Sequence, residues 1–295
     1  MNLFNDLDRR EIRAAFERAS DTYDVAAVLQ REIADRLLER LDFIRLVPAR
    51  VLDAGCGTGY SLPSLSRRYR QATIIGMDLA AGMLRQARRR GGWLSRLGSR
   101  RQYLAGDFGQ LPFADASVDL VFSSLALQWC RPEAVFAECR RVLRPGGLLI
   151  FSTFGPDTLK ELRQAWSAVD GGAHVHGFID MHDLGDQLLQ AGFAEPVLDV
   201  ERLTLTYETV RALLLDLKQL GAHNAMAARH RGLTGKRRFS AFTAAYEQWR
   251  RDGRLPATYE VVYGQAWVPA GSPNRNQVDG GVGIPVSSIR RHPNS

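Results

Sequence analysis

The sequence is poor in cysteine and has no long apolar run. It contains only three cysteines, and their spacing matches no disulfide framework and no zinc site. No apolar stretch approaches the length that a membrane span requires, and the first ten residues, MNLFNDLDRR, lack the apolar segment of a secretory signal. These absences lead us to expect a soluble protein of the reducing cytoplasm, with no metal and no membrane as a partner.

The basic charge of the chain comes mostly from arginine and is concentrated in two runs. The formal net charge is +7. Residues 85–101 include seven arginines and no acid, and residues 229–238 form a second basic run. Two interpretations remain open: an arginine-rich helix face in contact with water, or a docking surface for an acidic protein, a nucleic acid or a phosphorylated substrate.

Between residues 50 and 154 the hydrophobic pattern alternates between strands and helices, after a helical segment at 10–46. Short apolar runs predict strands at 50–55, 72–80, 101–108, 118–127 and 147–154. Amphipathic segments predict helices at 58–69, 81–90 and 132–143. This alternation indicates a parallel sheet with helices on both faces, whose ligand binds beyond the carboxyl ends of the strands.

The pattern loosens after residue 155. Periodic segments predict helices at 157–170, 181–193, 210–222 and 239–251. Further strands are predicted at 257–268 and at 195–209, where the pattern leaves open one bent strand or two short ones. The residues from 269 to 295 are rich in glycine, proline, asparagine and serine without periodicity, so we expect a disordered tail there.

The stretch VLDAGCGTG, residues 51–59, combines a buried strand with a glycine-rich loop. Glycines at such a turn let backbone N–H groups come close to a ligand. Gly55, Gly57 and Gly59 follow a G-x-G-x-G spacing, which differs from the G-x-G-x-x-G of dinucleotide sites. Asp53, just before them, would repel a pyrophosphate and would suit a ligand with a cationic amino group. S-adenosylmethionine is such a ligand.

Acidic residues also end the next two predicted strands. Asp78 lies roughly 20 residues beyond the glycine loop, where an acid binds ribose hydroxyls in either NAD or S-adenosylmethionine. Asp107 is placed to accept a hydrogen bond from an adenine amine, and Phe108 is placed to pack on the adenine ring. Leu79 and Ser124 complete the candidate cofactor-binding residues.

In combination, four segments resemble motifs of class I S-adenosylmethionine-dependent methyltransferases, the third segment running through two motifs. They are VLDAGCGTG, GMDLAAGML (76–84), AGDFGQLPFADASVDLVFSSLAL (105–127) and RVLRPGGLLIFSTF (141–154). The resemblance implies a Rossmann-like α/β fold with a mostly parallel seven-stranded sheet, helices on both faces and a helical lid. It divides the chain into a helical cap at 1–46, a cofactor-binding core at 47–155, the rest of the sheet with lid helices at 156–268, and the tail.

A narrower resemblance covers roughly residues 10–268. The segments FERASDTYDVAAVLQREIADRLLERL (16–41), LALQWC (125–130), QAWSAVD (164–170), LKQLGA (217–222) and TYEVVYGQAW (258–267) resemble the malonyl-acyl-carrier-protein O-methyltransferases of biotin synthesis. This resemblance implies methyl transfer to the free carboxylate of malonyl-acyl-carrier protein or malonyl-CoA. The methyl ester would then be extended to a pimeloyl chain. The strongly acidic acyl carrier protein becomes the expected partner of the basic runs.

The implied reaction requires no general base, because a carboxyl group with a pKa near roughly 4 is already ionised at neutral pH. Catalysis then depends on positioning and on exclusion of water. Gln128 and Trp129 follow the fourth strand and are candidates for both tasks. Tyr23 resembles the tyrosine that caps the cofactor in related methyltransferases. The arginine that would pair with the malonyl carboxylate is left open, and His174, His176 and His182 match no metal signature.

Three alternatives remain at this stage. The chain could be a class I methyltransferase acting on another small carboxylic acid or on a quinone precursor. It could be an RNA methyltransferase or nucleic-acid binder, although it lacks the asparagine-proline-proline-aromatic motif and shows no stacking repeats beside its basic runs. It could also be a cofactor-binding regulator without catalysis. We expect no nucleic-acid partner, and the sequence leaves the oligomeric state open.

Overall fold

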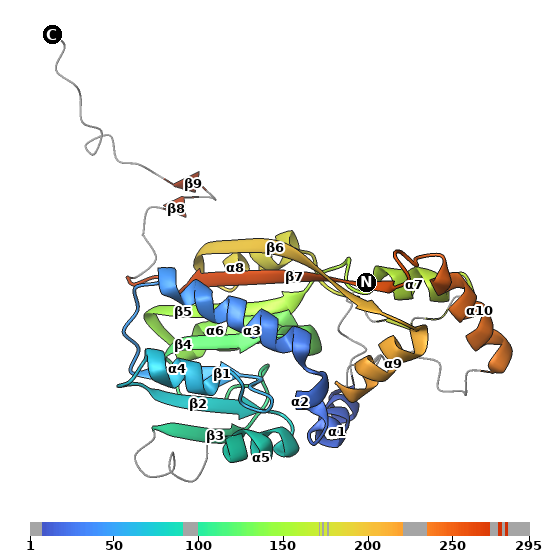
Figure 1. The fold of residues 1–295 in the computed structure, drawn as a ribbon. Helices are drawn as coiled ribbons and strands as arrows, with labels where there is room; N and C mark the ends of the chain where they lie inside the picture. Colours follow the sequence, from blue (N-terminus) through green and yellow to red (C-terminus); the bar gives the residue numbers. More distant parts are fainter. Residues whose placement is uncertain are drawn as a thin grey trace.

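The core of the protein is a seven-stranded sheet with the strand order β3-β2-β1-β4-β5-β7-β6 (Figure 1). The computed structural model describes residues 8–90, 100–170, 172, 174–175, 177–220, 235–271, 277–278 and 281–282. The strands of the sheet are β1 (Arg50–Ala54), β2 (Thr73–Asp78), β3 (Arg101–Ala105), β4 (Val118–Ser124), β5 (Leu143–Phe154), β6 (Ala194–Tyr207) and β7 (Leu255–Trp267).

The sheet is mostly parallel, as the sequence predicts. Strands β1 to β5 pair in parallel, and β7 runs antiparallel between β5 and β6. Strand β6 is one long strand with an irregular register near its start, which settles the choice that the sequence left open. Strand β5 begins at Leu143 and so corrects the predicted start at 147, because Leu143 already pairs with Val118 before the register shifts.

Helices cover both faces of the sheet because successive strand residues point to opposite sides. Val51 joins the buried cluster beneath α3 and α4, whereas its neighbour Leu52 joins the cluster beneath α6 and α8. The helices are α1 (Arg9–Ala19), α2 (Tyr23–Ala26), α3 (Val28–Arg40), η1 (Leu41–Phe43), α4 (Leu62–Arg68), α5 (Ala81–Arg90), η3 (Leu127–Trp129), α6 (Pro132–Val142), α7 (Lys160–Ser167), α8 (Met181–Gln190), α9 (Val210–Gln219) and α10 (Lys236–Glu247).

The segment 10–46, predicted as helical, is divided into three helices and a short 3-10 turn. Thr22 and Ala27 lie at the breaks, where the backbone of Ala27 leaves the helical region with a ψ of 41°. The breaks let α1 and α2 turn away from α3 toward the carboxyl ends of the parallel strands (Figure 1). The short helix α2 thereby brings its first residue, Tyr23, to the place where ligands of such sheets bind.

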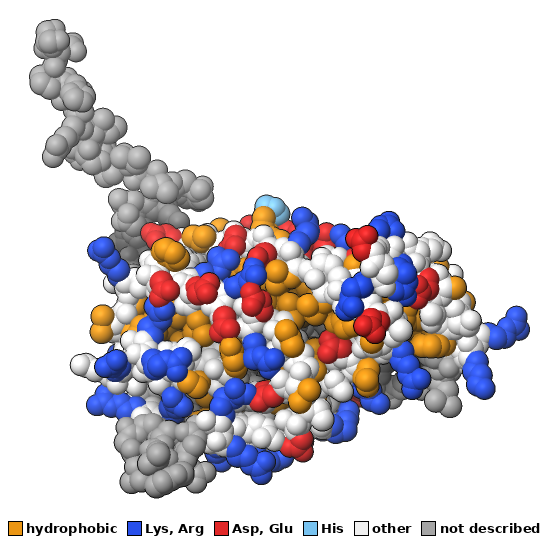
Figure 2. Space-filling model, viewed as in Figure 1, with side chains coloured by type: hydrophobic (Ala, Val, Ile, Leu, Met, Phe, Trp, Pro, Cys, Tyr) orange, Lys and Arg blue, Asp and Glu red, His pale blue; other side chains and the backbone are white. Residues whose placement is uncertain are grey.

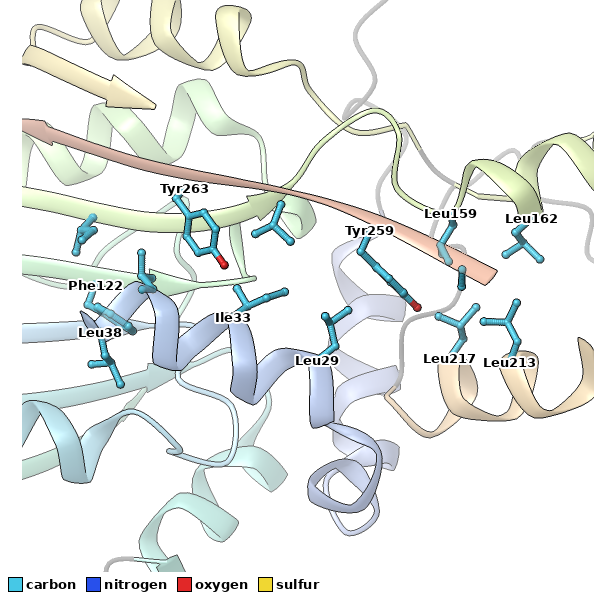
Figure 3. Packing of buried hydrophobic residues seen from close by; sticks show 14 of the residues in the cluster. Leu29, Ile33, Leu38, Phe122, Leu159, Leu162, Leu213, Leu217, Tyr259 and Tyr263 are labelled. Atoms are coloured by element: carbon cyan, nitrogen blue, oxygen red, sulfur yellow. The ribbon is translucent and has the colours of Figure 1, made fainter. Parts of the chain in front are cut away.

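Helices α7, α9 and α10 lie at the same end of the sheet, and we call these three helices the lid (Figure 1). One apolar core runs continuously from the sheet into the lid. Figure 3 shows Ile33 and Leu38 of α3 near Phe122 and Tyr263, and farther along Leu159, Leu162, Leu213, Leu217 and Tyr259 pack together. The lid helices are therefore held to the sheet by the same kind of packing that holds α3, which fixes the position of their inner faces.

The described part of the tail contains β8 (Gln277–Val278) and β9 (Gly281–Val282), which pair with each other. Most of the stretch predicted to be disordered lies outside the described residues. Within the part of the chain that the structure describes, every helix falls short of the combined length and apolar character that a bilayer span requires.

Candidate functional site

Three adjoining cavities lie beyond the carboxyl ends of the parallel strands. The first, which we call the slot, has a volume of about 100 Å³ and lies between α1 and the loops that follow β1, β2, β3 and β4. The second, the loop cavity, lies between the glycine-rich loop and the segment from α2 to the start of α3. The third, the lid cavity, has a volume of about 220 Å³ and lies beneath α7 and α9.

The three cavities meet at a few shared side chains. Tyr23 and Ser124 line both the slot and the loop cavity. Trp129 lines the slot and the lid cavity, and Gln30 lines the loop cavity and the lid cavity. Three of these four residues were predicted site residues, and the structure brings them together from α2, β4 and η3. Gln30 was not predicted.

The three glycines of the loop have different surroundings although all have positive φ angles. A Cβ on Gly55 would lie 2.3 Å from the Cβ of Ala126, and a Cβ on Gly59 would lie 2.8 Å from the Cβ of Ala87. A Cβ on Gly57 would meet no atom within 4 Å. Gly55 and Gly57 line the cavities, whereas Gly59 lets the loop pack closely against α5.

Asp53 is buried at the end of β1, with 2% of its surface exposed. It lines the loop cavity, and its Oδ2 is buried without a hydrogen-bond partner. Burial, followed by the nearby Asp78 carboxyl, raises the pKa of Asp53 to about 8. Because an unpaired buried carboxylate is unfavourable, this site favours a cationic ligand group in the loop cavity.

Asp78 ends β2 and lines the slot. Its Oδ1 accepts from the N–H of Ala80 at 2.8 Å, and its Oδ2 accepts from the N–H of Gly57 at 2.9 Å. Burial raises the pKa of Asp78 to about 6, although these backbone hydrogen bonds act in the opposite direction. Leu79, the next residue, also lines the slot.

Asp107 lines the slot, but its carboxylate already has two partners. Oδ2 pairs with the guanidinium of Arg9 at 2.5 Å, and Oδ1 accepts from the N–H of Gly109 at 2.8 Å. Arg9 itself lines the slot from α1. An adenine amine in the slot would therefore meet a carboxylate shared with Arg9, a residue that the sequence did not bring to attention.

Aromatic rings form the walls of the slot. Phe108 is 6% exposed and lies on the side of the strand ends. On the side of α1, Phe16 meets Trp129 edge to face, with ring centroids 5.4 Å apart and planes at 86°. A flat aromatic group such as adenine suits this space, because aromatic pairs favour offset-stacked or edge-to-face contacts.

Tyr23 lies between the slot and the loop cavity and packs beside Ala26, Ala27 and Leu220. Burial raises the pKa of its phenol well above the ordinary value, and the carboxyl groups of Asp78 and Asp24 act in the same direction. The phenol therefore stays protonated at neutral pH. Since Leu220 follows α9, the contact also links the N-terminal segment to the lid.

Gln128 is buried at 5% exposure and lines the lid cavity. Its Nε2 donates to the carbonyl oxygen of Leu125 at 2.8 Å, and its Oε1 accepts from Oγ1 of Thr153 at 3.4 Å. These bonds hold the amide against the end of β4. Gln128 thus shapes the floor of the cavity beside Trp129.

The rest of the lid cavity is mainly apolar and aromatic. Trp166 stacks between His174, with ring centroids 3.9 Å apart, and Phe242, with centroids 4.1 Å apart. His174 Nε2 is 2.8 Å from Asp170 Oδ1, and Asp170 also pairs with Arg238. The Arg238 guanidinium, followed by the His174 contact, lowers the pKa of Asp170 below its usual range. These interactions fix the wall formed by Trp166 and His174.

The other candidate histidines and part of the two basic runs can also be located in the structure. His182 is the second residue of α8, and His176 lies outside the described residues. Among the residues that are described, no cluster of three potential metal ligands occurs. Arg90 donates to the carbonyl oxygen of Thr58 at 3.1 Å and pairs with Asp24, so it supports the loop cavity. Residues 91–99 and 229–234 of the two runs lie outside the described residues.

The chain is similar in sequence to known methyltransferases. The family described as "Methyltransferase domain" matches residues 52–151. The malonyl-[acyl-carrier protein] O-methyltransferase of Laribacter hongkongensis is 57% identical over 92% of this chain and 94% of the relative. The enzyme of that name from Gallionella capsiferriformans is 54% identical, again over 92% and 94%. Among solved structures, the YcgJ protein from Bacillus subtilis superposes with a TM-score of 0.56, covering 81% of this chain and 99% of its own, at 14% identity.

Proposed function

This chain belongs to the malonyl-[acyl-carrier protein] O-methyltransferase family, and we propose that its three adjoining cavities divide the two substrates between them. The enzyme transfers a methyl group from S-adenosylmethionine to the free carboxylate of a malonyl group on acyl carrier protein. The methyl ester primes pimeloyl synthesis for biotin. We assign the adenosine to the slot, the methionine end to the loop cavity and the malonyl thioester to the lid cavity. The single observation that carries this assignment is that the three cavities meet at Tyr23, Gln30 and Trp129.

The residues of the slot and of the loop cavity fit S-adenosylmethionine. The buried, unpaired Oδ2 of Asp53 is suited to the ammonium group, and Asp78 is suited to the ribose hydroxyls. Gly57 leaves open space for the methionine chain of the cofactor, and Phe108 offers a ring face for adenine. The cofactor contains no phosphate, so the acid at the end of β1 favours its binding where it would oppose a dinucleotide.

The methyl transfer requires no proton transfer by the protein. Bound there, S-adenosylmethionine supplies a sulfonium methyl group, which an ionised carboxylate can accept without losing a proton. The side chains at the junction then have two tasks, to orient the carboxylate and to exclude water. We assign water exclusion to Trp129 and to the protonated phenol of Tyr23, and we assign the shape of the acyl site to Gln128.

We also propose that the acidic carrier protein docks over the lid. Lys218 of α9 lines the lid cavity and is exposed, and Arg211 lies seven residues earlier on the same helical face. Lys236 and Arg237 are exposed at the start of α10, where Figure 2 shows basic side chains projecting at that end of the molecule. Opposite charge would steer the carrier protein to this face and bring its acyl arm to the cavity. The three unpaired cysteines agree with a cytoplasmic location.

The proposed function is tested by offering different acceptors with tritium-labelled S-adenosylmethionine. Malonyl-acyl-carrier protein should accept the labelled methyl group, and acetyl-acyl-carrier protein should not, because it has no free carboxylate. Free malonic acid and succinyl-acyl-carrier protein should be poor acceptors. Efficient labelling of free acids with none on the carrier protein would instead support the alternative of a small-acid methyltransferase.

A further inference from the structure

The side chain of Gln30 has an unpaired oxygen that the assignments above do not use. Gln30 is the third residue of α3, and its side-chain Oε1 is buried without a hydrogen-bond partner. Burying an amide oxygen without a partner is unfavourable, so such a group indicates that a donor is supplied by something else. The packing of α3 does not explain this buried oxygen, because the apolar contacts of the helix are made by Leu29, Ile33 and Leu37.

The position of Gln30 suggests where that donor comes from. Among the residues that the structure describes, Gln30 is the one side chain that lines both the loop cavity and the lid cavity. The loop cavity also holds the unpaired Oδ2 of Asp53, and the lid cavity holds Trp129 and Gln128. A side-chain amide offers an acceptor at one end and two N–H donors at the other. Gln30 thus stands between the cavity assigned to the methionine end of the cofactor and the cavity assigned to the malonyl group.

We propose that Gln30 bridges the two substrates and couples their binding, an inference that rests on the proposed function. Its Oε1 accepts a hydrogen bond from the cofactor ammonium in the loop cavity. This fixes the amide so that Nε2 donates to the malonyl carboxylate in the lid cavity. The neutral amide orients the carboxylate beside the methyl group without neutralising its charge, so the oxygen keeps the electron pair that forms the new O–C bond as the S–C bond breaks.

Two substitutions of Gln30 should have different effects if it bridges the substrates. Gln30→Leu removes both the acceptor and the donors of the amide, and should weaken the binding of both substrates. Gln30→Glu keeps an acceptor for the ammonium but places a carboxylate against the malonyl carboxylate. We therefore expect Gln30→Glu to bind adenosylhomocysteine as well as the unaltered chain does, and to bind malonyl thioesters poorly. Since burial raises the pKa of a carboxyl, its malonyl defect should diminish as the pH falls.

The experiment compares both variants with Gln71→Leu and Gln71→Glu, which make the same changes at an exposed residue outside the three cavities. Calorimetry gives the Kd for adenosylhomocysteine, and the Kd for malonyl-acyl-carrier protein with and without saturating adenosylhomocysteine. Rate measurements from pH 6 to pH 8 give kcat and KM. Because coupling between sites is reciprocal, one ligand must tighten the other by the same factor.

The unaltered chain should bind malonyl-acyl-carrier protein more tightly when adenosylhomocysteine is present, and Gln30→Leu should lose that difference. Its kcat/KM for malonyl-acyl-carrier protein should fall about 10- to 100-fold, the range expected for losing a hydrogen bond to a charged group. Retained coupling in Gln30→Leu, or equal losses of both ligands in Gln30→Glu, would overturn the proposal. Absence of methyl transfer by the unaltered chain would overturn the proposed function, and this proposal with it.

Discussion

The backbone N–H of Gly57 donates to Asp78 Oδ2 at 2.9 Å, so the glycine-rich loop after β1 is fastened to the acid that ends β2. The bond holds the loop in the positive-φ conformation that Gly57 adopts. The nearby acid Asp53 has a buried side-chain oxygen, Oδ2, that has no hydrogen-bond partner. In the proposed arrangement, the acid assigned to the ribose is therefore already held in place, and the acid assigned to the ammonium group has an oxygen without a partner.

Replacing Asp53 with asparagine should weaken cofactor binding without unfolding the protein. The change removes the negative charge opposite the ammonium but keeps the shape of the side chain. We expect the Kd for adenosylhomocysteine to rise about 10- to 100-fold, because hydrogen bonds between charged groups are among the stronger ones. Calorimetry measures this, and Asp186→Asn on the exposed face of α8 serves as the control. An unchanged Kd for adenosylhomocysteine would show that Asp53 does not bind the ammonium group.

The stability of the ligand-free protein should decrease as the pH rises. Burial holds the pKa of Asp53 at about 8 and that of Asp78 at about 6, both above the ordinary value of 3.8. Between pH 4 and pH 8 the unfolded chain gives up these protons before the folded protein does, so the free energy of unfolding falls. Urea titrations at several pH values measure the slope.

The variant Asp53→Asn separates the two contributions to that slope. It should show a flatter dependence, with the remaining decrease ending near pH 6, where Asp78 titrates. It should also be more stable than the unaltered chain at pH 8, because no buried charge forms. A slope identical to that of the unaltered chain would contradict the assigned cause.

Alanine at Gly57 and alanine at Gly59 should have different effects. Both positions have positive φ, with values of 53° and 76°, which alanine adopts at a cost of about 1–2 kcal/mol. At Gly59 the added Cβ also meets Ala87, and such overpacking costs a further 1–3 kcal/mol or so. At Gly57 the Cβ has open space in the protein but would occupy space that we assign to the cofactor.

We therefore expect Gly59→Ala to lower the Tm more than Gly57→Ala does. Relative to its loss of stability, Gly57→Ala should weaken adenosylhomocysteine binding more than Gly59→Ala does. Thermal unfolding with and without the ligand gives both quantities. Equal ligand-induced shifts of Tm in the two variants would show that Gly57 has no special place at the ligand.

The sequence was most informative about the strands and their carboxyl ends. Short apolar runs predicted β1 to β4, and Asp53 and Asp78 lie at strand ends as expected. The prediction that Asp107 ends the third strand was wrong, because β3 ends at Ala105 and Asp107 lies in the loop that follows. The sequence could not predict the Arg9 partner of Asp107, because those residues are 98 positions apart. The lid cavity could not be predicted from the sequence either, since Gln30 and Trp166 come to line the same cavity only because α3, α7 and α9 pack onto one core. Local pattern determines an element, whereas tertiary packing determines which elements share a cavity.

Reversing charge on the lid should impair use of the carrier protein specifically. The double variant Lys236→Glu with Arg237→Glu should raise the KM for malonyl-acyl-carrier protein and spare a short malonyl thioester that makes no contact with the lid surface. The effect should diminish at high ionic strength, because exposed charges are screened by salt. The double variant Arg88→Glu with Arg89→Glu on α5 is the matched control and should change neither KM. A larger effect of the α5 variant on the KM for malonyl-acyl-carrier protein would indicate that the carrier protein docks on α5 and not on the lid.

The division of the substrates among the three cavities is tested most directly by a crystal structure of the enzyme with adenosylhomocysteine and a malonyl thioester analogue. We predict the adenine beside Phe108, the ammonium at Asp53, and the malonyl carboxylate beneath the lid between Gln30 and Trp129. A malonyl group bound outside the lid cavity, or an ammonium group away from Asp53, would contradict the account.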